Sequence, residues 1–222
     1  MSRAASAGLP YYLGGEITDR DALLLHTPQS LARSLALDVR TGHEVLAVSP
    51  AERRVRVWDL ATHQDYDETY DALVLSTGAA PMVPPVPGTD LPSVRVLRTV
   101  PDADGLRRIV DGGARRAVLV GAGFIGLEVA EALRHRGLDV TVIELAGQVL
   151  PAMDPEMARS VELELRRGGV NVRLSSTVAG FRETAGGTVV EVSDGSTLAA
   201  DLVLLATGVR PETSLAAGPA SP

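Results

Sequence analysis

Three glycines, Gly121, Gly123 and Gly126, stand in the spacing G-x-G-x-x-G between two segments of different periodicity. The apolar run 117–120 before them is typical of a strand buried on both faces. After them, apolar residues recur at helical spacing until Gly137. In such a corner the first glycine permits a tight turn, the second lets the backbone approach a phosphate, and the third lets the helix pack closely on the strand. The pattern therefore predicts a phosphate cradle at the N-terminus of a helix.

An acid, Glu144, ends the next predicted strand, 140–143. A carboxylate roughly 20 residues after such glycines accepts hydrogen bonds from an adenosine ribose. The helix N-terminus adds free N–H groups and about half a positive charge for a pyrophosphate. The combination predicts a dinucleotide site, against the alternative that the glycines serve only a tight turn. The candidate contacts are Gly121, Ala122, Gly123, Phe124, Ile125, Gly126 and Glu144.

The cofactor choice follows from charge near Glu144. No Arg or Lys follows it before Arg159, and a carboxylate repels a 2′-phosphate. NADH is therefore favoured over NADPH.

Composition excludes several function classes. The chain has 222 residues and a net charge of −7, which argues against nucleic acid or an anionic membrane as partner. No apolar run reaches the length of a membrane span and the N-terminus lacks the apolar core of a signal peptide, so a cytoplasmic protein is expected. The chain has no cysteine, which excludes disulfides and thiol chemistry by the chain itself. The histidines are scattered without metal-ligand spacing, so no metal site is expected.

The remaining elements are predicted from periodicity, caps and turn residues. Upstream of the glycines they are a turn-rich loop at 8–15, a helix opening at Thr27-Pro28 over 29–36, a β-hairpin of strands 45–48 and 53–59, a buried strand within 71–78, a proline-rich linker at 81–92 and a helix at 101–110. Downstream they are a helix at 154–167, a strand at 170–174, a β-meander of strands 178–182, 188–192 and 197–198, and a buried strand within 201–208.

Two of these segments, 71–81 and 201–211, repeat one pattern. Each begins with Asp, continues with aliphatic residues and ends in Thr-Gly-x-x-Pro. The better explanation than coincidence is two related nucleotide-binding units. The glycine loop lies well upstream of the second copy, and the same distance counted back from Gly78 falls before residue 1. The first unit is therefore expected to lack its glycine-rich head.

The repeat leads to a domain prediction. Residues 1–95 form a partial FAD-binding domain, 96–213 an NAD(P)-binding domain, and 214–222 a disordered tail. A parallel strand such as 72–75 needs neighbours on both edges. Residues 1–95 are therefore expected to fold poorly when expressed alone, while 96–213 fold.

Two Thr-Gly strand ends around an inserted G-x-G-x-x-G-x-E unit resemble the flavin-dependent pyridine nucleotide–disulfide oxidoreductases, along nearly the whole chain. Three segments (8–15, 39–45 and 149–157) are similar to the branch of coenzyme A-disulfide reductases and NADH oxidases. The resemblance implies an α/β fold, in which a Rossmann-like NAD-binding domain with a parallel sheet, helices and a β-meander is attached to an incomplete FAD-binding domain. It also implies hydride flow from NADH to FAD, then to a redox-active cysteine and a disulfide, persulfide or oxygen acceptor.

The resemblance assigns roles to further residues. Glu128 matches a glutamate near the nicotinamide–flavin junction, with a solvated helix carboxylate as the alternative. Phe124 stands where the family often has a tyrosine that covers the isoalloxazine, with ordinary helix packing as the alternative. Gly208 matches the backbone that passes the nicotinamide end. Thr77 and Gly78 match its equivalent on the FAD side.

The departures from the family pattern bear on activity. Ala7 occupies the position of the redox cysteine, and a methyl group cannot form a sulfenate, persulfide or mixed disulfide. No catalytic residue is therefore assigned. The 222 residues contain no N-terminal FAD glycine motif, no second FAD segment and no dimerisation domain of the family. Two expectations about partners stay open: a homodimer, or a flavin half supplied separately.

Two functions remain. The first is an FAD- and NAD(P)H-dependent oxidoreductase of this type, acting on small molecules. The alternative is a truncated, catalytically inactive NAD(H)-binding module. A stand-alone Rossmann dehydrogenase is disfavoured, because nothing supplies a Tyr-Lys proton relay or a catalytic His with a substrate domain.

Overall fold

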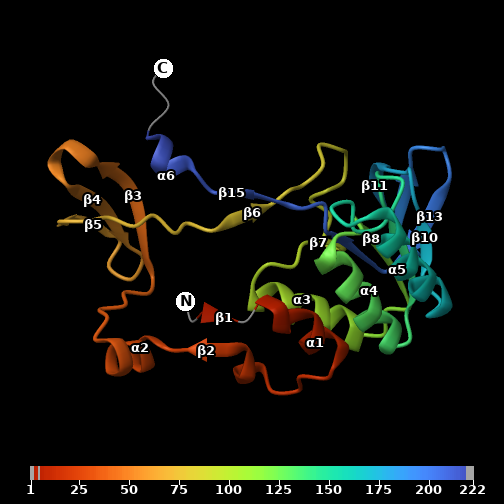
Figure 1. Ribbon diagram of the computed structural model, residues 1–222, viewed down its shortest axis with the longest axis horizontal. Helices are drawn as coiled ribbons and strands as arrows, with labels where there is room; N and C mark the ends of the chain where they lie inside the picture. Colours follow the sequence, from red (N-terminus) through yellow and green to blue (C-terminus); the bar gives the residue numbers. More distant parts are fainter. Residues whose placement is uncertain (1–2, 5, 219–222) are drawn as a thin grey trace. The chain divides into compact units, whose positions relative to one another are not determined.

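A computed structural model describes residues 3–4 and 6–218, and contacts divide this part of the chain into two compact units (Figure 1). The larger unit comprises Ala4–Leu23 and Pro81–Gly208. The smaller unit comprises, of the described residues, 3, 24–80 and 209–218. This grouping differs from the predicted boundary at residue 95, because the chain enters the larger unit twice. The assignment of NAD and FAD binding to two domains stays a prediction.

A parallel sheet of five strands forms the centre of the larger unit. The strands, in sheet order, are β10 (Asn171–Arg173), β9 (Asp139–Ile143), β8 (Arg116–Val120), β14 (Leu202–Leu205) and β7 (Val94–Arg95). Each neighbouring pair is parallel, with Val118 opposite Thr141 on one side and Val203 on the other. The predicted α/β fold with a parallel sheet is confirmed.

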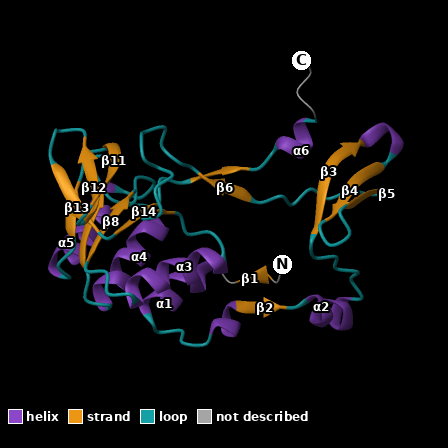
Figure 2. Cartoon of the chain, turned by 180° about the vertical axis from the view of Figure 1, so that it is seen from behind, coloured by secondary structure: helices purple, strands orange, loops and turns teal. Residues whose placement is uncertain are grey.

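Two layers enclose this sheet, the meander on one face and helices on the other (Figure 2). On one face Val118, Val120 and Val203 share a buried cluster with Phe181 and Val190 of an antiparallel meander. The meander strands are β11 (Val178–Thr184), β12 (Gly187–Val192) and β13 (Thr197–Ala200). Side chains alternate along a strand, so Leu119, which lies between Val118 and Val120, faces the helices on the other side. The central strands β8 and β14 are therefore apolar on both faces, as their apolar runs in the sequence predicted.

The helices of the larger unit are α1 (Leu9–Gly14), α3 (Val100–Asp111), α4 (Phe124–His135) and α5 (Pro155–Arg167). A capping box starts α3, in which the Thr99 hydroxyl accepts the N–H of Asp102 and the Asp102 carboxylate accepts the N–H of Thr99. Asp154, the first residue of the predicted helix 154–167, is the N-cap residue of α5, and its side chain makes no capping hydrogen bond. In α5 the buried Glu162 pairs instead with Arg159 and Arg166 at 2.9 and 2.8 Å.

The predicted turn-rich loop at 8–15 is wrong, since α1 occupies it. Leu9 and Leu13 lie one helical turn apart and are fully buried, and Gly15 ends the helix with φ +88°. Tyr12 donates its hydroxyl to Asp104 on α3 at 3.1 Å, and the guanidinium of Arg107 lies 4.5 Å from its ring centroid. These contacts with α3 outweigh the turn propensity of the glycines and proline.

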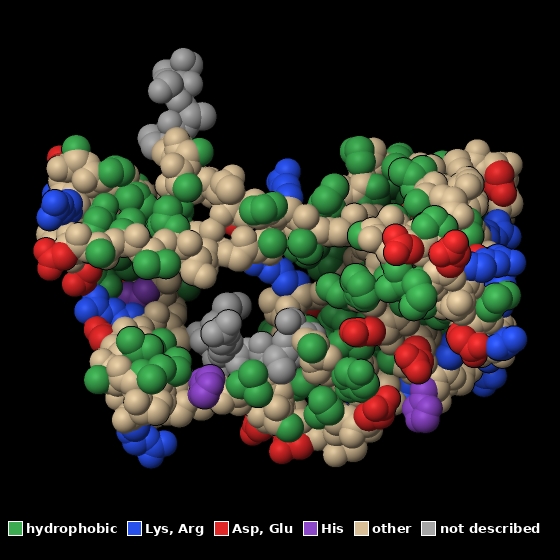
Figure 3. Space-filling model, viewed as in Figure 1, with side chains coloured by type: hydrophobic (Ala, Val, Ile, Leu, Met, Phe, Trp, Pro, Cys, Tyr) green, Lys and Arg blue, Asp and Glu red, His purple; other side chains and the backbone are tan. Residues whose placement is uncertain are grey.

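An antiparallel sheet of three strands forms the body of the smaller unit: β3 (His43–Ser49), β4 (Arg54–Asp59) and β5 (Gln64–Thr69). The predicted hairpin is confirmed, and the polar strand β5 was missed because it lacks apolar alternation. The predicted helix after Thr27 is α2 (Pro28–Leu35), with Thr27 as N-cap. Hydrophobic side chains reach the surface over this sheet (Figure 3). Leu46 of β3 is 48% exposed.

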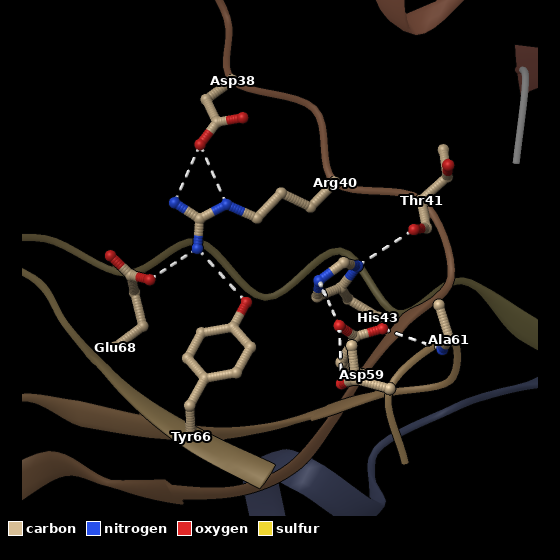
Figure 4. A network of polar contacts seen from close by, with 9 residues as sticks. Asp38, Arg40, Thr41, His43, Asp59, Ala61, Tyr66 and Glu68 are labelled. Atoms are coloured by element: carbon tan, nitrogen blue, oxygen red, sulfur yellow. Dashed lines mark hydrogen bonds and ion pairs between the residues drawn. The ribbon is translucent and has the colours of Figure 1, made fainter. Parts of the chain in front are cut away.

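Polar contacts tie the edge of this sheet together (Figure 4). The guanidinium of Arg40 contacts Asp38 at 2.8 Å, Glu68 at 2.6 Å and the Tyr66 hydroxyl at 3.2 Å. These acceptors, Glu68 foremost, raise the pKa of Arg40 above its ordinary value. Arg40 therefore connects the loop that precedes β3 to strand β5.

The predicted buried strand within 71–78 is wrong. No strand forms there, and every residue of the segment is exposed, with Val74 at 86%. The aliphatic residues Leu73–Leu75 read as a buried strand, but such a strand needs partners on both edges, and the sheet of the smaller unit ends at β5. The segment leads into β6 (Ala79–Pro81), which pairs with β15 (Val209–Pro211).

Several short elements complete the described chain. They are β1 (Arg3–Ala4), β2 (Leu24–His26), α6 (Ser214–Ala217) and three 3₁₀ turns at Ser6–Gly8, Arg20–Leu23 and Pro50–Glu52. The disorder predicted for 214–222 is wrong at α6, and residues 219–222 lie outside the described part. Among the described residues no helix combines the length and apolar character needed to cross a bilayer. The cytoplasmic location stays a prediction.

Asp201 joins two strands of the large sheet and makes stability depend on pH. Its carboxylate accepts the N–H groups of Arg115 and Arg116 at 2.9 Å and the Arg116 guanidinium at 2.6 Å. The Arg116 guanidinium, followed by these backbone bonds, lowers the pKa of Asp201 to about 2. The lowered pKa stabilises the fold above the unfolded pKa of about 4, and this stabilisation is lost as the pH falls toward 2.

We predict that Asp201→Asn lowers the free energy of unfolding by about 2 kcal/mol at pH 7, because the charged partner of Arg116 is removed. Denaturant titrations at pH 7 and pH 3 measure the change, and the difference between wild type and variant should narrow at pH 3. Asp139→Asn is the control, since this carboxylate is 89% exposed. An equal difference at both pH values would contradict the role of ionised Asp201.

Candidate functional site

The glycine turn after β8 is held by backbone contacts that exclude a side chain. Gly121 has φ +107°, and a Cβ added there would lie 2.3 Å from the carbonyl oxygen of Ala206 at the end of β14. Its N–H donates to Ile143 of β9 at 2.8 Å. A Cβ added at Gly126 would lie 2.2 Å from the carbonyl oxygen of Gly121. Helix α4 therefore sits directly on the turn, as the spacing predicts.

Gly123 differs from the other two glycines. It is the N-cap of α4, and a Cβ added there would meet nothing within 4 Å. No side chain caps α4, and its first turn has no acidic residue. The N-terminus of this 12-residue helix thus has no side-chain cap and has open space beside Gly123, which is the arrangement that binds phosphate groups.

A cavity of about 490 Å³ lies against this helix end, at the carboxyl ends of β8, β9 and β14. Ligands of open α/β sheets bind at this edge. The lining residues are Met82, Val83, Pro84, Pro85, Val120, Gly121, Gly123, Ile143, Glu144, Leu145, Pro151, Ser176, Thr177, Ala206, Thr207 and Gly208. None of these described residues carries a positive charge, so only backbone amides and the helix end are available for an anionic ligand.

Glu144 lies in the cavity wall with both carboxylate oxygens engaged. Oε2 accepts the N–H of Ala122 at 2.7 Å, and Oε1 accepts the N–H of Ala146 at 2.8 Å. The carboxylate therefore fixes the glycine turn as well as facing the cavity. Each oxygen keeps a second lone pair, so a ribose diol can still donate to it.

The structure brings together only part of the predicted set. Gly121, Gly123, Glu144 and Gly208 line the cavity, whereas Ala122 is fully buried behind it. Gly126 supports the turn without lining the cavity. Phe124 and Ile125 are exposed on the first turn of α4, at 66% and 46%.

Phe124 and Glu128 belong to a different hollow. They line a cavity of about 340 Å³ between α4 and α5, together with Leu127 and Leu165. Thr77 and Gly78 belong to the smaller unit, in the exposed segment before β6. Their predicted flavin roles are not tested by this geometry.

Sequence reasoning missed one wall of the main cavity. The segment Met82–Pro85 was predicted as part of a linker because of its prolines, yet it lines the same cavity as Gly121. Met82 donates its N–H to Gly208 at 2.9 Å. The Thr-Gly ends of the repeat were the available signal, since one of them holds this segment.

Comparisons with known proteins agree with this geometry. The family model of pyridine nucleotide-disulphide oxidoreductases matches residues 8–221. An NADH oxidase from Methanocaldococcus jannaschii is 39% identical over 212 residues, covering 94% of this chain and 46% of that protein. A coenzyme A disulfide reductase from Staphylococcus epidermidis is 32% identical over 209 residues, with coverages of 94% and 46%.

Among solved structures, the water-forming NADH oxidase from Lactobacillus brevis bound to NADH is similar, with a TM-score of 0.90 at 34% identity. The match covers 96% of this chain and 48% of that chain. The chain thus spans about half the length of the curated relatives it matches.

We predict that Glu144→Ala speeds hydrogen exchange at the amides of Ala122 and Ala146 by about tenfold in the ligand-free protein, because both lose a charge-assisted hydrogen bond. Exchange measured by NMR gives the rates. Glu131→Ala, an exposed acid on α4, is the matched control. Unchanged protection of Ala122 in Glu144→Ala would show that the carboxylate does not hold the turn.

Proposed function

The chain belongs to the pyridine nucleotide-disulphide oxidoreductase family, and from this membership we propose that it is the NADH-binding part of an FAD- and NADH-dependent oxidoreductase. The observation that carries the proposal is the open space at Gly123 beside the free end of α4. The pyrophosphate of NADH would lie there, held by backbone N–H groups and the helix dipole.

The residues that line the cavity suggest where the two ends of the dinucleotide would lie. The adenosine ribose would donate its hydroxyls to Glu144, which the amides of Ala122 and Ala146 hold in place. The nicotinamide end would lie toward Thr207 and Gly208 at the other side of the glycine turn. NADH is favoured over NADPH, because a fixed carboxylate without a basic neighbour in the cavity wall repels a 2′-phosphate.

The reaction is proposed from relatives that span twice this length. Hydride from NADH would reach FAD, and the electrons would pass to a disulfide, persulfide or oxygen acceptor; the flavin supplies this redox chemistry when bound. The two residues predicted on the flavin side do not form a flavin cradle by themselves: Gly78 is exposed, and the Thr77 hydroxyl donates a hydrogen bond to the carbonyl oxygen of Glu212. We therefore assign no step to residues at a flavin.

Ala7 limits what this chain does with a disulfide. It is exposed in the 3₁₀ turn before α1, and it cannot form a covalent sulfur intermediate. The alternative function is a catalytically inactive NAD(H)-binding module. A flavin half supplied by a separate polypeptide, or a homodimer, would reconcile the family with this chain.

We predict that Gly123→Val abolishes NADH binding, at least a hundredfold loss of affinity, because its side chain would occupy the space of the pyrophosphate. Titration of NADH fluorescence with the full chain measures the affinity, and wild type should bind NADPH more weakly. Gly186→Val is the matched control, since a Cβ there also meets nothing within 4 Å but lies in the β11–β12 turn. Equal NADH affinity of Gly123→Val and wild type would refute the site.

Flavin absorbance separates the two functions. The inactive module predicts a colourless purified chain that still quenches NADH fluorescence. The oxidoreductase hypothesis predicts a flavin absorbance band in the blue region of the visible spectrum. NADH should bleach this band, either in the chain alone or after a flavin-binding partner is added. A chain that takes up FAD without reduction by NADH would contradict hydride transfer.

A further inference from the structure

Thr207 makes a hydrogen bond that no ligand role explains. Its hydroxyl donates to the carbonyl oxygen of Met82 at 2.6 Å, and Met82 returns a bond from its N–H to Gly208 at 2.9 Å. The Met82 sulfur would lie 3.7 Å from a Cβ added at Gly208. The end of β14 and the segment 82–85 are thus fastened to each other at Met82.

The other copy of the repeat has the same bonding. The Thr77 hydroxyl donates to the carbonyl oxygen of Glu212, and the N–H of Glu212 donates to Gly78 at 2.9 Å. In both copies Thr-Gly holds the backbone of a residue that follows the other copy in the sequence. A hydroxyl used in this way twice indicates that the shared Thr fastens the chain rather than contacts a ligand directly.

The fastened segment depends on few anchors. Pro84 and Pro85 have no N–H to donate. The segment is held at its start by Met82 and beyond its end by Pro87, whose carbonyl accepts the N–H of Phe181 at 2.9 Å. The carbonyl of Pro84 accepts the N–H of Val86 at 2.8 Å, a bond within the segment itself. Because the two prolines cannot donate hydrogen bonds to the rest of the unit, the Thr207–Met82 bond has a large share in fixing this wall of the cavity.

The position of the wall identifies what it would contact. Strands β9 and β14 flank β8 in the sheet, so Glu144 after β9 and Thr207 after β14 lie on opposite sides of the glycine turn. Met82 lies on the side of Thr207, to which it is hydrogen-bonded. With the ribose at Glu144 and the pyrophosphate at Gly123, the nicotinamide half extends toward Met82 and Val83, whose apolar side chains are 47% and 51% exposed. An apolar wall fits the face of a planar ring.

We propose that Thr207 is a positioning residue: by fastening Met82 it holds Met82–Pro85 as the wall against which the nicotinamide ring of NADH packs. The inference rests on the proposed NADH site. It separates the two halves of the ligand, since the wall should matter for NADH and not for ADP-ribose, which lacks the nicotinamide ring.

The test compares NADH and ADP-ribose affinities of the full chain by calorimetry. Thr207→Val removes the hydroxyl at constant volume and should weaken NADH about tenfold while ADP-ribose stays within twofold of wild type. Thr207→Ser keeps the hydroxyl and should restore NADH affinity. Met82→Ala keeps the backbone bonds, removes the wall side chain and should also weaken NADH alone, so it serves if Thr207→Val fails to fold.

Thr184→Val is the matched control, because the Thr184 hydroxyl also donates to a backbone carbonyl, that of Gly187 at 2.8 Å, but in the β11–β12 turn. It should leave both affinities unchanged. Unchanged NADH affinity in Thr207→Val and Met82→Ala would overturn the proposed role of Met82–Pro85. An equal loss of affinity for NADH and for ADP-ribose would overturn it as well. Failure of wild type to bind either ligand, or full binding by Gly123→Val, would instead overturn the proposed NADH site.

Discussion

The contact of three backbones at Gly121 is the constraint on which the larger unit depends. The carbonyl of Ala206 and the first turn of α4 both approach this residue closer than any side chain allows. The approach brings the ends of β8 and β14 together with the start of a helix. It leaves the N–H groups of that helix facing a cavity instead of a neighbouring chain. The geometry of the proposed binding site therefore results from tight packing, and a substitution at Gly121 would alter the packing and the site together.

The sequence predicted the elements whose residues carry their own signal. The strand–glycine–helix unit, α3 and the meander follow from periodicity, caps and turn glycines, which act over a few residues. Segments whose state depends on distant partners were misjudged. Residues 8–15 contain turn formers, yet the burial of Leu9 and Leu13 makes them a helix. Residues 71–78 contain a strand pattern, yet a strand cannot exist without a sheet to join.

The site divides in the same way. Gly121, Gly123 and Gly126 were predictable because their spacing encodes a backbone shape. Glu144 was predictable as an acid at a strand end, but its bonds to Ala122 and Ala146 were not, since no sequence pattern reports which amides reach a carboxylate. The wall at Met82–Pro85 was missed because its role comes from pairing with residues more than a hundred positions away. A sequence pattern of a few residues thus predicts local backbone shape, but it does not predict which distant residue a backbone N–H or carbonyl group bonds to.

The exposed strip Leu73–Leu75 has a consequence for the behaviour of the chain in solution. Extended backbone with bare aliphatic side chains is a template that other extended chains can pair with. Mutual repulsion at a net charge of −7 opposes such encounters between copies. Added salt shortens the range of that repulsion, to about 8 Å at physiological ionic strength. Ionic strength and protein concentration should therefore affect how readily copies of this chain associate through the exposed strip, and dilute, low-salt buffers should oppose that association.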